Sequence, residues 1–92
     1  MSTVYTGSAT WNPSLIGTGN EESQDITVTG AVVGDIVQVS FSLDLEDLEL
    51  TATVALANTV TCVLSNRTTG TITLSSGTCR VRVTSLSGLH VT

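Results

Sequence analysis

The sequence predicts an all-β fold, and three observations support this prediction. Apolar side chains recur at every second position, as in Val37, Val39 and Phe41 and again in Val81 and Val83. This period places one face of an extended strand in a core and the other face outside. Seventeen of the 92 residues are threonine, which is β-branched and suits a pleated sheet better than a helix. Turn signals recur roughly every 8–12 residues, and no long window has helical spacing.

The first third of the chain predicts one short strand and one longer one. We expect residues 1–10 to be an N-terminal arm, followed by a short strand that ends at Trp11-Asn12-Pro13. Residues 14–23 are rich in Gly, Asn and Glu and are typical of a loop. A strand is expected over residues 24–29, and the glycines that follow mark a short connection over residues 30–35.

The middle of the chain has the clearest alternation. The strongest strand is expected over residues 36–43, followed by an acidic connection over residues 44–49. Another strand is expected over residues 50–57. Asn58-Thr59 then predicts a tight hairpin turn into a strand over residues 60–65.

The last third predicts a turn at residues 66–70, a short edge segment at 71–74 and a final strand at 78–85. We expect the tail, residues 86–92, to fray or to dock on a neighbour. Together these elements make one domain over residues 1–92, a small antiparallel β-sandwich or barrel of six to seven strands, Ig-like or jelly-roll-like. Strand order decides between sandwich and barrel.

Composition predicts an oligomer without nucleic-acid or membrane partners. A domain of 92 residues has a thin core. Only 12% of its residues are charged, and it has no lysine. We therefore expect part of its apolar surface to face another chain. The net charge is −5, and the only cations besides His90 are Arg67, Arg80 and Arg82. Three arginines are too few to follow a phosphate backbone. An acidic chain does not dock electrostatically on anionic membranes, and no apolar run is long enough to span one.

The first residues, Met1 to Tyr5, have neither the basic nor the apolar region of a signal peptide, so we expect a complete product made in the cytoplasm. Cys62 and Cys79 are in phase with the apolar positions of their strands and should point into the core. Two buried thiols are the favoured interpretation, because cytosolic thiols stay reduced. A disulfide between neighbouring strands and a metal site remain as alternatives, although two cysteines do not complete a zinc site.

Catalytic chemistry has few candidate residues, and we expect no enzyme and no cofactor. His90, the only histidine, lies near the C-terminus, where a general base would be poorly held. Without it there is no Ser-His-Asp or Cys-His nucleophile system. The acidic run Asp44 to Glu49 could serve a glycosidase or bind calcium. Its leucines favour instead a solvated connection anchored to the core, so no metal is expected. Asn66-Arg67-Thr68 matches a glycosylation sequon, interpreted here as chance.

The aromatic residues are few: Tyr5, Trp11 and Phe41, of which Phe41 is in phase with the core positions of its strand. Trp11 is interpreted as a core residue, with an oligomer contact or a sugar-stacking platform as alternatives. The predicted oligomer or partner contacts are apolar or aromatic residues near the two ends of the chain: Tyr5, Trp11, Leu15, Ile16 and Leu89.

An ordered series of short motifs carries a family resemblance over about residues 8–83. The motifs are turns and Thr/Val strands: Ser8–Pro13, Ile26–Ala31, Gly34–Asp35, Val39–Leu45, Ala57–Asn66 and Gly77–Val83. The series resembles small β-sandwich modules of tailed-phage virion proteins, including those of cyanobacterial phages. This chain departs from the expected pattern by having cysteine at positions 62 and 79 and by the acidity of Glu46-Asp47.

The resemblance implies a structural or binding role, since such modules end tail or fibre proteins or decorate the capsid as short chains. We expect a decoration (cement) protein on the capsid surface of a virion, a homotrimer that binds the major capsid protein and stabilises its shell. The physical reason for a trimer is multivalency, since three linked contacts bind more tightly than one. The alternative is a trimeric tail-fibre or tail-tip module that binds a host receptor or glycan.

Overall fold

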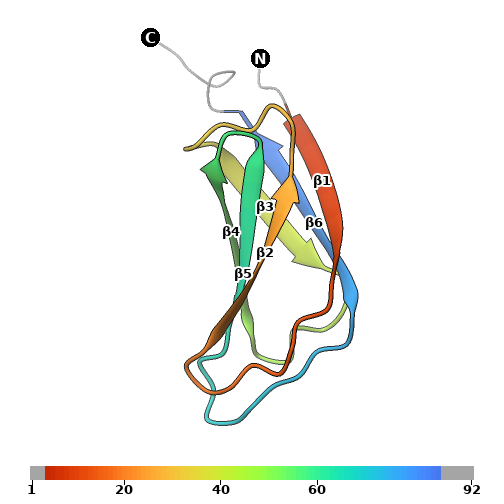
Figure 1. Cartoon of the computed structure of the whole chain (residues 1–92), viewed down its shortest axis with the longest axis vertical. Coiled ribbons are helices and arrows are strands. Elements are labelled where there is room, and N and C mark those ends of the chain that lie inside the picture. The colour runs from red at the N-terminus through yellow and green to blue at the C-terminus, as the bar shows by residue number, and fades with distance from the viewer. Residues whose placement is uncertain (1–3, 86–92) are drawn as a thin grey trace.

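The structure, a computed structural model, describes residues 4–85 and consists of two three-stranded antiparallel sheets packed face to face (Figure 1). The strands are β1 (Val4–Trp11), β2 (Glu21–Thr27), β3 (Ile36–Phe41), β4 (Glu49–Leu56), β5 (Thr59–Ser65) and β6 (Gly77–Thr84). One sheet has the order β1-β6-β3 and the other β2-β5-β4. The all-β prediction is confirmed, and the architecture is a six-stranded sandwich.

Four of the five connections cross from one sheet to the other, and only β4 and β5 form a hairpin. This topology places β5 and β6 at the centre of their sheets, each hydrogen-bonded to a strand on both sides. Side chains on the inner faces of these two strands are therefore covered from every direction. They form the centre of the core: Val60, Cys62, Leu64, Cys79, Val81 and Val83.

The edge strands close the core with larger or half-buried side chains. Val37, Val39 and Phe41 of β3 pack against the central cluster. Trp11 at the end of β1 is only 4% exposed and meets Phe41 edge to face, with 6.2 Å between ring centroids. Such a contact adds to the hydrophobic gain from burial. The interpretation of Trp11 as a core residue is therefore confirmed.

The predicted N-terminal arm is wrong from Val4 onward. Strand β1 pairs with β6 along its whole length, from Val4 opposite Thr84 to Trp11 opposite Gly77. The inward positions of β1 before Trp11 are taken by Tyr5, Gly7 and Ala9, two of which are too small to produce a clear alternation. Gly7 is required by packing, because a Cβ there would lie 2.8 Å from a methyl carbon of Val28.

Other boundaries moved by a few residues. Strand β2 begins at Glu21, three residues earlier than expected, because residues 21–23 pair with β5. The polar composition of this segment gave no sign of a strand. The expected edge segment at residues 71–74 is not a strand and contributes one isolated bridge, Ile72 to Ile16. The predicted tail, residues 86–92, lies outside the described residues.

The hairpin turn is Ala57-Asn58, one residue earlier than expected, and Asn58 has a positive φ of 67°. Asn58 also joins the hairpin to the connection after β2. Its N–H donates to the carbonyl of Ala31 (2.8 Å), and its side-chain oxygen accepts from the N–H of Gly30 (2.8 Å). These bonds hold the β4–β5 hairpin against the start of the connection that leads from β2 to the other sheet.

Gly30 and Gly34 have the same backbone strain on substitution, because both have a φ of 100°. They differ in the packing around them, so the two effects can be measured separately. A Cβ at Gly34 meets nothing within 4 Å, whereas a Cβ at Gly30 would lie 2.6 Å from the ring of Tyr5. Gly34→Ala is expected to cost about 1–2 kcal/mol of the free energy of unfolding through backbone strain. Gly30→Ala should cost about 1–3 kcal/mol more, because the Tyr5 ring must move. Urea denaturation of both variants measures the difference, and equal losses would contradict the described packing of Tyr5.

Candidate functional site

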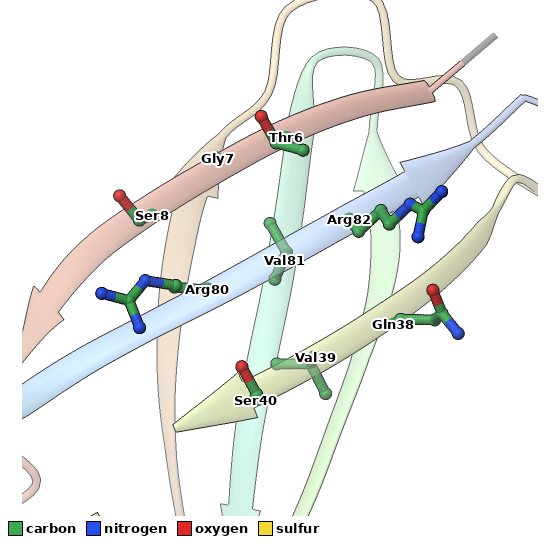
Figure 2. A pocket seen from close by; sticks show the side chains of 9 residues that line it. All are labelled: Thr6, Gly7, Ser8, Gln38, Val39, Ser40, Arg80, Val81 and Arg82. Carbon is green, nitrogen blue, oxygen red and sulfur yellow. The ribbon is translucent and has the colours of Figure 1, made fainter. Parts of the chain in front are cut away.

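The outer face of the β1-β6-β3 sheet carries the most distinctive polar arrangement of the described residues. Arg80 and Arg82 project from the central strand, two residues apart and on the same side (Figure 2). The strand register places a hydroxyl or amide side chain on each side of both arginines: Thr6, Ser8, Gln38 and Ser40. A shallow hollow of about 560 Å³ lies over this part of the sheet and is lined by these side chains and the strand backbone.

The two arginines lack ionic partners among residues 4–85. Both side chains are exposed, and neither makes a hydrogen bond or an ion pair with any described residue. The exposed positions of β1, β3 and β6 carry no acidic side chain. A guanidinium presents five N–H donors in a planar fork that matches carboxylate oxygens. This face can therefore bind anions.

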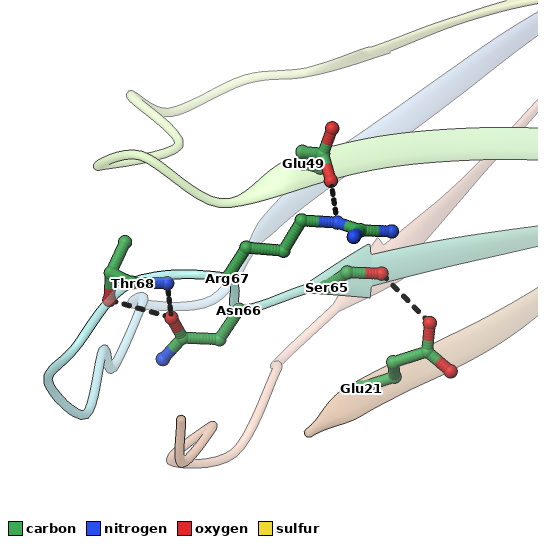
Figure 3. Close-up of polar contacts among 6 residues, drawn as sticks. All are labelled: Glu21, Glu49, Ser65, Asn66, Arg67 and Thr68. Atoms are coloured by element: carbon green, nitrogen blue, oxygen red, sulfur yellow. Dashed lines mark hydrogen bonds and ion pairs between the residues drawn. The ribbon is translucent and has the colours of Figure 1, made fainter. Parts of the chain in front are cut away.

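The outer face of the β2-β5-β4 sheet has the opposite charge. Its carboxylates are Glu21, Asp25 and Glu49. Unlike the two arginines, each has a partner within the chain. Ser65 donates to Glu21 (3.0 Å), and Arg67 pairs with Glu49 (Figure 3). Thr61 donates to Asp25 (2.8 Å). The carboxylates on the outer face of the β2-β5-β4 sheet thus have partners within the chain. The two arginines on the other outer face have no such partner among residues 4–85.

Asn66 of the glycosylation sequon has a structural role that sequence reasoning missed. Its side chain is 1% exposed and fully hydrogen-bonded. The amide nitrogen donates to the carbonyls of Ile16 and Gly70, both at 2.8 Å. The amide oxygen accepts from the N–H of Thr68 (2.9 Å) and from its hydroxyl (2.7 Å; Figure 3). Because Nδ2 is enclosed in this way, the folded chain cannot present it for glycosylation.

The backbone of Asn66 extends the same network. Its N–H donates to the carbonyl of Asn20 (3.0 Å), and its carbonyl accepts from the N–H of Gly19 (2.8 Å). One buried residue therefore joins the connection between β1 and β2 to the connection between β5 and β6. The signal for such a role in the sequence is an Asn followed two residues later by Thr, which is typical of a turn capped by its own side chain.

Cys62 and Cys79 both point into the core, as predicted, but they belong to opposite sheets. Both are free thiols, and their sulfur atoms lie 3.6 Å apart. Burial raises the pKa of Cys62 to about 12 and also raises the pKa of Cys79. Thiols held protonated in this way are poor nucleophiles and poor metal ligands. The favoured interpretation, two buried apolar thiols, agrees with this geometry.

The acidic run, except for Glu49 at the start of β4, forms part of the loop between β3 and β4. Leu48 is buried and Leu45 packs against the core, so the leucines anchor the loop as expected. Glu46 and Asp47 stand at its tip with positive φ angles of 49° and 75°. Among residues 4–85, no three His, Cys, Asp or Glu side chains are grouped closely enough to hold a metal ion.

The five predicted contact residues do not form one surface. Trp11 and Ile16 are buried in the core, and Tyr5 is half-buried with its ring against Gly30. Leu15 is 66% exposed, and the contact expected there stays a prediction. Leu89, like His90, lies outside the described residues.

A group of exposed apolar residues was missed. Five large apolar side chains lie on segments at one end of the sandwich: Val4, Val32, Val33, Ile36 and Leu56. At this end β1 and β3 begin, β4 ends and the β2–β3 connection runs (Figure 1). We call it the apolar end. Its residues come from four segments, so no local pattern in the sequence reveals it.

Asn66→Asp tests the loop network with a nearly isosteric change. The carboxylate cannot donate to the carbonyls of Ile16 and Gly70, so we expect the free energy of unfolding to fall by about 3 kcal/mol or more. Asn20→Asp makes the same chemical change at an exposed side chain of the same network and should cost less than about 1 kcal/mol. Thermal and urea unfolding measure both, and similar losses would contradict the role of the Asn66 side chain.

No helix among residues 4–85 has the length and apolar character needed to cross a membrane. Comparison of the chain with protein-family models, with curated proteins and with solved structures finds no match.

Proposed function

We propose that this chain is a non-enzymatic virion structural protein that decorates the capsid of a tailed bacteriophage and stabilises its shell of major capsid protein. In this proposal the chain is made in the host cytoplasm and acts on the capsid surface as a homotrimer. Two things support it: the resemblance of residues 8–83 to small phage β-sandwich modules, and the apolar end of the sandwich.

The apolar end is the observation that carries the proposal. Leu56 is 67% exposed and Val33 is 63% exposed. Exposed apolar side chains gathered at one end of a small domain are typical of a surface that meets another protein. The thin core of a domain this size makes the burial of this surface by a second copy of the chain favourable.

The trimer has a physical advantage on a repeating shell. A single small domain offers too little contact area for tight binding, whereas three linked copies bind with a high effective concentration. Val4 and Ile36 of the apolar end both lie opposite Thr84, at one end of the outer face of the β1-β6-β3 sheet. The pairs around Arg82 and Arg80 follow further along the strands, so in this proposal assembly through the apolar end leaves that part of the outer face available for the shell.

The alternative, a fibre or tail-tip module that binds a glycan, has less support. Sugar-binding surfaces use exposed aromatic rings, and Trp11 is buried against Phe41. Tyr5 and Phe41 also lie on the inner face of their sheet. No aromatic side chain stands on the outer face of either sheet within residues 4–85.

Quantitative mass spectrometry of purified virus particles tests the function directly. A capsid decoration protein is expected at a simple large fraction of the copy number of the major capsid protein. A handful of copies per particle would move the chain to the tail or fibre. Its absence from particles would overturn the virion proposal.

The oligomer is tested by a matched pair of leucine variants. Leu56 at the apolar end and Leu15 at the opposite end are equally exposed, at 67% and 66%. Leu56→Asp is expected to reduce the mass measured by light scattering to that of one chain, 9.5 kDa, because it places a charge in the interface. Leu15→Asp should leave the mass of the trimer unchanged. The reverse result would favour the contact predicted at Leu15, and a monomeric wild-type protein would overturn the trimer.

A further inference from the structure

We propose that the outer face of the β1-β6-β3 sheet is a docking surface for an acidic patch on a protein partner, with Arg80 and Arg82 as its anchors. We call it the arginine face, defined by Thr6, Ser8, Gln38, Ser40, Arg80 and Arg82. This inference deepens the proposed function. It rests on that function in one respect only, namely that the partner is the capsid shell.

The charge distribution is the first argument. The chain has a net charge of −5 and only three Lys and Arg residues, yet two of these stand on one face without an acid beside them. The third, Arg67, pairs with Glu49 on the other sheet. The arginine face is therefore a local positive patch on an acidic molecule. Such a patch selects an acidic partner and orients the chain as it approaches.

The geometry of the two guanidinium groups is the second argument. They extend in opposite directions over the face, so each can meet a separate carboxylate (Figure 2). The hydroxyl and amide groups beside them can bind neighbouring polar atoms. Strand geometry separates the Cα atoms of Arg80 and Arg82 by roughly 6.5 Å. A partner surface with two or more acidic side chains fits this arrangement, because each fork pairs with one carboxylate.

The shape and composition of the face favour a protein over other polyanions. The face is broad and shallow, and uncharged polar side chains flank the arginines. It has no aromatic ring on which a sugar or a base could stack. Two cations are also too few to follow a nucleic-acid backbone. A complementary protein surface can instead lie flat across the three strands.

The size of the face predicts weak binding by a single copy. Three strands of this length present roughly 300–400 Å² on one side, from the spacings of strands and residues. A stable interface buries about 800 Å² per partner. One copy is therefore expected to dissociate readily, and several linked copies to bind tightly. Because the anchors are charged, binding should weaken as the salt concentration rises.

The test uses charge-neutralising variants with a matched control. Arg80→Gln, Arg82→Gln and Arg67→Gln each change the net charge from −5 to −6, but only the first two alter the arginine face. Circular dichroism checks that each variant keeps the wild-type fold. Binding is measured by co-sedimentation with capsid shells that lack the chain, and by retention on immobilised poly-L-glutamate and on heparin, at low and high salt.

We expect R80Q and R82Q each to weaken binding to shells about tenfold, because each removes one charged hydrogen-bond donor. R67Q should leave the binding unchanged. If the wild-type chain binds shells and all three variants bind equally well, the inference is overturned while the proposed function stands. If the wild-type chain does not bind shells, the proposed function fails, and the inference is judged on poly-L-glutamate alone.

On poly-L-glutamate, salt-sensitive retention that R80Q and R82Q lose and R67Q keeps would support the arginine face as a site for acidic protein. Absence of retention, or equal retention of all variants, would overturn it. Retention on heparin without retention on poly-L-glutamate would also overturn it, because the surface would then select sulfated glycans.

Discussion

The packing of β5 against β6 is the interaction on which the rest of this structure depends. Each of these strands is the middle strand of its sheet, and their inner side chains form the buried centre of the sandwich. Cys62 and Cys79 meet there with 3.6 Å between their sulfur atoms. The larger rings of Trp11 and Phe41 close the side of the core. Because the edge strands only pair with β5 or β6, their placement follows from this contact.

A second constraint operates at the loops. Four connections cross between the sheets, and long connections are the least stable parts of a small sandwich. Asn66 holds two of them with both atoms of its side-chain amide, and Asn58 similarly joins the β4–β5 hairpin to the connection after β2. Each residue provides hydrogen-bond partners for backbone groups of the connections at the ends of the sheets. The hydrogen bonds of these two asparagines thus stabilise the connections of a domain whose core is small.

The same two-sheet architecture separates the charges. Alternation places Arg80 and Arg82 on the outer side of one sheet and Glu21, Asp25 and Glu49 on the outer side of the other. The acids are engaged by hydroxyl groups and by Arg67, whereas the two arginines have no such partner among the described residues. The apolar end adds a third kind of surface. A domain without an obvious catalytic pattern in its sequence therefore has three chemically distinct surfaces.

The sequence by itself determined most of the strands, most of the turns and most of the inward residues, because these depend on local alternation. The strands expected over residues 36–43 and 60–65, which span residues 36–41 and 59–65 in the structure, could be predicted on that basis, and so could the inward cysteines. Strand β1 could not, since Gly7 and Ala9 weaken its alternation. Only the tertiary structure decided which sheet each strand joins, and with it the rows around Arg80 and Arg82, the apolar end and the enclosure of Asn66. These features bring together residues far apart in the chain, and long-range pairing leaves no periodic trace in a single sequence.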